Sequence, residues 1–228
     1  MMIRWIPALA VLGIVLAILG AVLFPAALGG GGLLALGGAI VAQAACVLLT
    51  RIGPLSPRRA DPVVIRIGAV TGAVTGLLYG GEIVSEYVSS AVTDASVALG
   101  WAIVGTLVVS SMVAAAVATV RLRSIRAGLT AAAYAAIAEY LVWYPFVLGA
   151  YYAMRHSASL ERVWRAEGTY LDFARSGMSD IRAFVMQDFW GAGFFHLVAG
   201  LIIAGLFGTF ATLATRVAQR LLTSPAAP

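Results

Sequence analysis

The sequence has no lysine and no asparagine, and its single cysteine is Cys46. Only 11% of its 228 residues are charged, against about 25% in a typical soluble domain. Hydrophobic residues make up 61%, and the mean hydropathy is +0.96. This leaves too little polar surface to cover a globule in water, which argues against a soluble enzyme, a disordered regulator and a nucleic-acid-binding domain. The composition predicts an integral membrane protein.

Six apolar stretches are long enough to cross a bilayer, since a transmembrane helix needs about 20 mostly apolar residues. We therefore predict an all-α fold, a polytopic bundle that forms one integral membrane domain over residues 1–228. A glycine run at 29–32 predicts a hairpin between the first two helices, and a proline-rich stretch at 51–61 predicts a short polar connection. The expected spans are residues 3–28, 33–50, 63–88, 95–120, 127–154 and 193–215.

Arginine placement predicts the orientation of these spans. Short cytoplasmic loops carry an excess of basic residues, whereas long loops are largely exempt from this rule. With both termini in the cytoplasm, ten of the fifteen arginines lie on the cytoplasmic side and five lie in a long outer loop with five acidic residues. We expect a multi-pass protein of a bacterial inner membrane. The ten are Arg4, Arg51, Arg58, Arg59, Arg66, Arg121, Arg123, Arg126, Arg216 and Arg220.

The outer loop, residues 155–190, has apolar residues at helical spacing. Leu160, Val163 and Trp164 begin one such pattern, and Ile181 and Phe184 begin another that leads into the last span. Amphipathic helices of this kind suit a membrane surface or the top of a bundle. The loop is expected to be a packing cap, a moving lid or a docking site for a partner.

Gly68, Gly72, Gly76 and Gly80 recur at every fourth position of the third span. This small-xxx-small pattern predicts close approach of another helix backbone. The partner helix can belong to the same chain or to a second copy.

Aromatic residues gather in the second half of the fifth span and at the start of the sixth. Because Trp and Tyr favour the headgroup level, we predict an interfacial belt, with ligand stacking as the alternative. The residues are Trp143, Tyr144, Tyr151, Tyr152, Trp190, Phe194 and Phe195.

Three carboxylates, Glu82, Glu86 and Glu139, lie inside predicted spans. A charge at the bilayer centre costs about 2.5–3.5 kcal/mol on insertion scales, so such residues indicate a candidate site. Tyr79, Glu82 and Glu86 share one helix face because they are three and four residues apart. From a rise of about 1.5 Å per residue, Glu139 is expected near the middle of its span, and His196 about 12 Å nearer the outside than the middle of its own.

Three roles are open for this group of Glu82, Glu86, Glu139, His196 and Tyr79. It can form a proton or cation site open to the outside, it can supply protonated carboxyls that bond neighbouring helices, or it can line a wet cavity for a cationic or polar solute. The leading prediction is a small transporter or channel-like protein for protons, cations or a small polar solute.

Two other functions remain open. The first is a non-catalytic scaffold or accessory subunit that packs against a partner through the outer loop and the glycine face, the side of the third span that carries Gly68, Gly72, Gly76 and Gly80. The second, which is less favoured, is a membrane-embedded lipid enzyme. No phosphate-binding, zinc or nucleophile-elbow motif occurs, and no motif indicates a family. We expect no cofactor, leave the metal unassigned, and expect as partners the lipid bilayer and a second copy or a membrane subunit, but no nucleic acid.

Overall fold

A computed structural model describes residues 5–89 and 94–223, and every regular element in this part of the chain is a helix. Six of the helices are long and apolar enough to cross a membrane. The predicted all-α, six-span fold is thereby confirmed, and the chain is a multi-pass membrane protein. The six are α1 (Trp5–Leu23), α2 (Gly32–Arg51), α3 (Pro62–Ser89), α4 (Asp94–Leu122), α5 (Ile125–Met154) and α8 (Ile181–Thr223); the shorter elements are η1 (Pro25–Leu28), α6 (Ala158–Ala166) and α7 (Thr169–Ser176).

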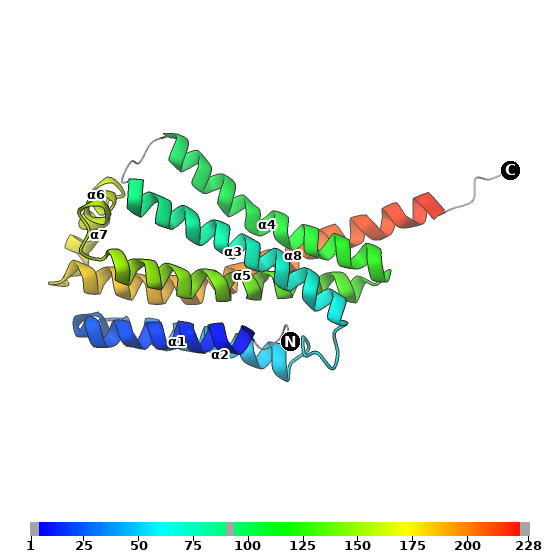
Figure 1. Ribbon diagram of the computed structural model, residues 1–228, viewed down its shortest axis with the longest axis horizontal. Helices are drawn as coiled ribbons and strands as arrows, with labels where there is room; N and C mark the ends of the chain where they lie inside the picture. Colours follow the sequence, from blue (N-terminus) through cyan, green and yellow to red (C-terminus); the bar gives the residue numbers. More distant parts are fainter. Residues whose placement is uncertain (1–4, 90–93, 224–228) are drawn as a thin grey trace.

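Helix α5 runs through the middle of the bundle, between α1 and α2 on one side and α3 and α4 on the other (Figure 1). Of its most apolar stretch, 83% is buried, against 44% for α3 and 28% for the other four spans. The outer helices instead expose large apolar side chains, as a lipid-facing surface requires. The short helices α6 and α7 lie at one end of the bundle, which we call the α6–α7 end (Figure 1). We call the opposite end the arginine end, after the arginines in the helix ends and links there: Arg51, Arg58, Arg59, Arg121, Arg123, Arg126, Arg216 and Arg220.

Short polar side chains cap several helices, as expected for backbone N–H groups without helical partners. The Asp61 side chain accepts a hydrogen bond from Val63 N (2.7 Å), and the Asp180 side chain accepts one from Arg182 N (2.8 Å). Asp180 therefore marks the start of α8. The last helix begins at Ile181 rather than at residue 193, because the second amphipathic segment of the predicted loop continues into the span without a break.

The α6–α7 segment closes its end of the bundle. Leu160, Val163 and Trp164 of α6 are buried, whereas no residue of α7 is. Arg182 of α8 pairs with Glu161 of α6 (3.1 Å) and also donates to the carbonyl of Arg155 (2.9 Å). These contacts hold α6 on the bundle.

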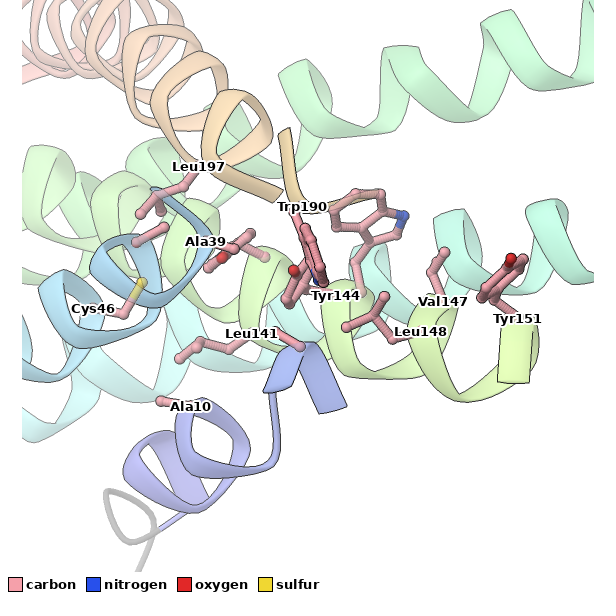
Figure 2. Close-up of a cluster of buried hydrophobic side chains, with 14 of the residues drawn as sticks. Ala10, Ala39, Cys46, Leu141, Tyr144, Val147, Leu148, Tyr151, Trp190 and Leu197 are labelled. Carbon is pink, nitrogen blue, oxygen red and sulfur yellow. The ribbon is translucent and has the colours of Figure 1, made fainter. Parts of the chain in front are cut away.

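The aromatic residues of α5 lie in the protein core and not in an interfacial belt. Trp143, Tyr144 and Tyr151 are almost completely buried, as is Trp190 of α8. Figure 2 shows Tyr144 beside Trp190, with aliphatic side chains of α1, α2, α5 and α8 around them, among them Ala10, Ala39, Leu148 and Leu197. The belt prediction was wrong for these four residues because α5 is enclosed by other helices, so its aromatic end meets protein instead of lipid. Phe194 and Phe195 are exposed.

The glycines of α3 lie against the backbone of α5. A Cβ added at Gly68, Gly72 or Gly76 would lie 2.4, 2.0 or 2.5 Å from the carbonyl oxygen of Ala131, Ala135 or Glu139, respectively. These distances are shorter than any normal carbon–oxygen contact. Only a residue without a side chain lets the two helices approach this closely, so the partner of the glycine face in this structure is a helix of the same chain.

Replacing Gly72 with alanine should destabilise the bundle. The new methyl group meets the α5 backbone, which cannot move aside as a side chain can, so we expect a loss of about 1–3 kcal/mol in the free energy of unfolding. The matched control is Gly81→Ala in the same helix, where nothing lies within 4 Å of the added Cβ. Thermal unfolding in detergent tests this, and an equal effect of the two substitutions would contradict the packing.

Candidate functional site

Glu139 and His196 meet in the interior of the bundle. His196 Nε2 of α8 lies 2.9 Å from both carboxylate oxygens of Glu139 on α5. The side chains are 12% and 2% exposed for His196 and Glu139, respectively. Both groups are thus nearly removed from solvent and bonded to one another.

Small residues on both sides of α5 make this meeting possible. Gly76 of α3 rests on the α5 backbone at Glu139, and Gly193 of α8 rests on the ring of Tyr144, where a Cβ would lie 2.4 Å from Cε2. Tyr79 and His196 each follow three residues later, on the same helix faces. The close packing of α3 and α8 therefore brings these two side chains toward Glu139.

Aromatic rings enclose the imidazole of His196. The Trp143 ring stacks on it at a centroid distance of 4.1 Å and an angle of 14°, and the Tyr79 ring lies at 5.4 Å and 23°. Tyr140 is further away, at 6.4 Å. An imidazolium between aromatic faces gains a cation–π attraction of about 0.5–2 kcal/mol per favourable contact. The rings therefore fix the orientation of the imidazole.

The pair can hold one proton in two ways. The proton resides on His196 as an imidazolium beside a carboxylate, or on Glu139 as a carboxylic acid beside a neutral imidazole. In the described part of the chain, His196 is the only basic group within ion-pairing distance of Glu139. The nearest arginines along α5, Arg126 and Arg155, are about 20 and 24 Å away at 1.5 Å per residue. Only His196 can therefore balance the buried charge.

A line of ionisable groups leads from this pair toward the α6–α7 end. The Tyr79 hydroxyl is within electrostatic reach of Glu139, Glu82 and Glu86. The carboxyls of Glu82 and Glu86 are within hydrogen-bonding reach of each other, one turn further along α3. Beyond them lies Glu167, in the α6–α7 connection, whose pKa is raised by partial burial and by the Glu86 carboxylate. The line ends at the surface of the bundle.

A small cavity adjoins Glu139 on its other side. Ser110 and Ser111 of α4 line it together with Ala136 and Gly200, and its volume of about 10 Å³ is that needed for a single water molecule. Between this cavity and the arginine end, the helices contact one another through alanine side chains. The next polar contact in that direction is between the hydroxyls of Thr119 and Thr212, which are 3.5 Å apart. This alanine layer consists of Ala115, Ala132, Ala136, Ala204 and Ala211.

Four of the five predicted site residues lie in the same region of the bundle: Tyr79, Glu82, Glu139 and His196. The fifth, Glu86, lies one helical turn beyond Glu82 on α3. The depth assigned to His196 was wrong. The direct contact puts the His196 side chain level with the Glu139 carboxylate. The estimate failed because it took the midpoint of each span as the middle of the bilayer, which ignores how α8 is aligned against α5.

Sequence reasoning missed two contributors to the site. Trp143 was assigned to an interfacial belt, although its position four residues after Glu139 places both on one face of α5. Glu167 gave no signal, since its proximity to α3 depends on how α6 packs. Gln43 of α2, which is also buried, donates a hydrogen bond to the Tyr140 hydroxyl (3.1 Å).

Within residues 5–89 and 94–223, no three His, Cys, Asp or Glu side chains gather in a geometry that could hold a metal ion. No protein-family model, curated protein or solved structure matches the chain.

A double-mutant cycle should show strong coupling between Glu139 and His196. His196→Phe keeps the ring stacking but leaves Glu139 buried without a partner, so we expect it to lower the free energy of unfolding by about 3–5 kcal/mol. The double substitution Glu139→Met with His196→Phe leaves no unpaired polar group and should recover most of that loss. Denaturant titration in detergent measures both. Additive losses would mean that the two side chains do not interact.

Proposed function

We propose that this chain is a small membrane transporter in which the Glu139–His196 pair is the proton-binding site. The observation that carries the proposal is the 2.9 Å contact of a buried carboxylate with a buried imidazole between the spans. An intramembrane ionisable group is typical of a transport or proton pathway. A pair that can hold its proton on either member is suited to accept and release it.

The geometry favours protons over the other candidates. A cavity of about 10 Å³ beside Glu139 has room for a water molecule and not for an organic solute. Two groups, Glu139 and His196, are fewer ligands than a bound metal ion normally takes. A proton needs only a chain of groups that can exchange it, which the line through Tyr79, Glu82 and Glu86 supplies.

Access to the pair is proposed to be one-sided in this conformation. The carboxylate line opens toward the α6–α7 end, and the alanine layer closes the path toward the arginine end. The arginine asymmetry supports a cytoplasmic location for the arginine end and for both termini, in a bacterial inner membrane. A transport cycle then requires α4 or α8 to move relative to α5, so that the alanine layer opens.

The scaffold alternative is less well supported. Its main surface, the glycine face of α3, is covered by α5 of the same chain. A partner subunit would have to use another surface, and no contact in the described residues favours one.

A flux assay tests the proposal. The protein is reconstituted into liposomes with a pH-sensitive dye inside, and valinomycin imposes a potassium diffusion potential. We expect proton uptake above that of empty liposomes, and Glu139→Gln should reduce it by about a hundredfold, the loss typical of a missing proton-transfer group.

The matched control is Asp172→Asn, which neutralises an exposed carboxylate of α7 outside the site. It should leave the flux unchanged. Wild-type flux in Glu139→Gln, reconstituted in equal amounts and monodisperse in detergent, would contradict the proposal, as would an absence of flux in the wild-type protein.

A further inference from the structure

Two adjoining cavities form a groove between α2 and α8 at the α6–α7 end. The outer cavity, of about 540 Å³, lies between the turn at residues 29–31 and the first turns of α8, which meet at this end of the bundle (Figure 1). The inner cavity, of about 310 Å³, lies further along the same two helices. Gly191 lines both, and we call the two together the α2–α8 groove. Each volume is in the range of small-molecule sites, about 300–1,000 Å³.

The groove follows one face of α8. Four of its lining residues are three or four positions apart and therefore share a helix face: Phe184, Asp188, Gly191 and Phe195. Phe184 and Asp188 line the outer cavity, whereas every described residue that lines the inner cavity is apolar. The groove is thus charged near the end of the bundle and apolar toward its middle.

Contacts on either side of Gly191 fix the two walls. Toward the middle of the bundle, a Cβ added at Gly38 of α2 would lie 3.4 Å from Phe194 Cβ of α8, so the two helices touch there. At the outer end, Gln187 Nε2 donates to the carbonyl of Gly29 (3.5 Å). Between these contacts, a Cβ added at Gly191 would have no atom within 4 Å. The helices are held together at both points, and the space at Gly191 stays open.

Asp188 decides the charge of a ligand. Its side chain is exposed, and within residues 5–89 and 94–223 no basic side chain forms an ion pair with it. None of the described lining residues is basic. The groove therefore attracts a cation, and the ring of Phe184, one turn from Asp188, can add a cation–π contact. The phosphate of a phospholipid would have no basic partner in this lining.

The inner cavity decides the rest of the ligand. Leu34 of α2 and Phe195 of α8 line it and are 84% and 71% exposed, so an apolar tail can cover them. Asp188 and Phe195 are seven residues apart, which is about 10 Å along a helix. A molecule with a positive head and an apolar tail can therefore contact both at once.

We propose that the α2–α8 groove binds a hydrophobic cation, an ammonium group on a single apolar tail. The ammonium lies at Asp188, and the tail lies along Phe195 and Leu34. Binding here does not require the Glu139–His196 pair to carry protons, so the site would stand if the transport proposal failed.

Binding of radiolabelled dodecyltrimethylammonium tests the site. The full-length protein in phosphatidylcholine nanodiscs is titrated with this probe, and its partition into nanodiscs without protein is subtracted. We expect saturable binding. Asp188→Asn should weaken it about tenfold, because the charge that faces the ammonium is lost. Gly191→Leu keeps Asp188 but fills the groove, and it should weaken binding at least as much.

Each substitution has a matched control that should bind the probe as the wild-type protein does. Asp172→Asn neutralises an exposed carboxylate of α7 that pairs with Arg175 and does not line the groove. Gly205→Leu adds the same side chain to α8 at another position where a Cβ has no atom within 4 Å.

Four outcomes would overturn the proposal. Wild-type affinity in Asp188→Asn would exclude recognition of the charge, and wild-type affinity in Gly191→Leu would exclude the groove as the binding site. Losses in the controls equal to those in the groove variants would show a diffuse effect. Displacement of the probe by dodecanol, at the concentration at which unlabelled dodecyltrimethylammonium displaces it, would show an apolar site without preference for a cation.

Discussion

The close approach of α3 to α5 is the constraint on which the rest of this structure depends. Along the glycine face there is no room for a single added methyl group, and Gly193 of α8 rests on the ring of Tyr144 of α5. Because other helices enclose α5, its polar and aromatic residues face protein and not lipid. Glu139 is buried for this reason, and a buried carboxylate requires a partner.

The partner that the packing supplies is His196, and stability alone does not account for the pair. A buried ion pair gains in mutual attraction about what it loses in desolvation, and well-packed apolar side chains commonly serve as well or better. The aromatic rings of Trp143 and Tyr79 then add a fixed orientation that a purely structural hydrogen bond does not need. A desolvated pair with a fixed orientation is reasonable for a group that must take up and release a proton inside the membrane. This reasoning motivates the transport proposal.

Much of the fold could be predicted from the sequence, because the apolar runs are long and most of them end at glycine, proline or arginine. Intramembrane carboxylates could likewise be identified one by one, since any charge in a span is unusual. Their three-dimensional relations could not. The contact of Glu139 with His196 depends on the register of α8 against α5, and the apolar sequence of a span does not indicate how it is aligned with its neighbour.

The roles of the aromatic residues were unpredictable for a related reason. Trp143 and Tyr144 would form an interfacial belt on a lipid-exposed helix, and they form a core on an enclosed one. Hydropathy measures the composition of a helix and not the identity of its neighbours.

Carbodiimide labelling, mapped by mass spectrometry, tests the central claim most directly, because the reagent attacks protonated carboxyls in apolar surroundings. The account predicts that Glu139 is labelled in the folded, detergent-purified protein and that metal cations do not suppress the labelling. No labelling of Glu139 at any pH would show a carboxylate fixed in helix packing and out of reach of exchange. Suppression by one metal cation would show a metal site. Either result would contradict a proton-binding pair.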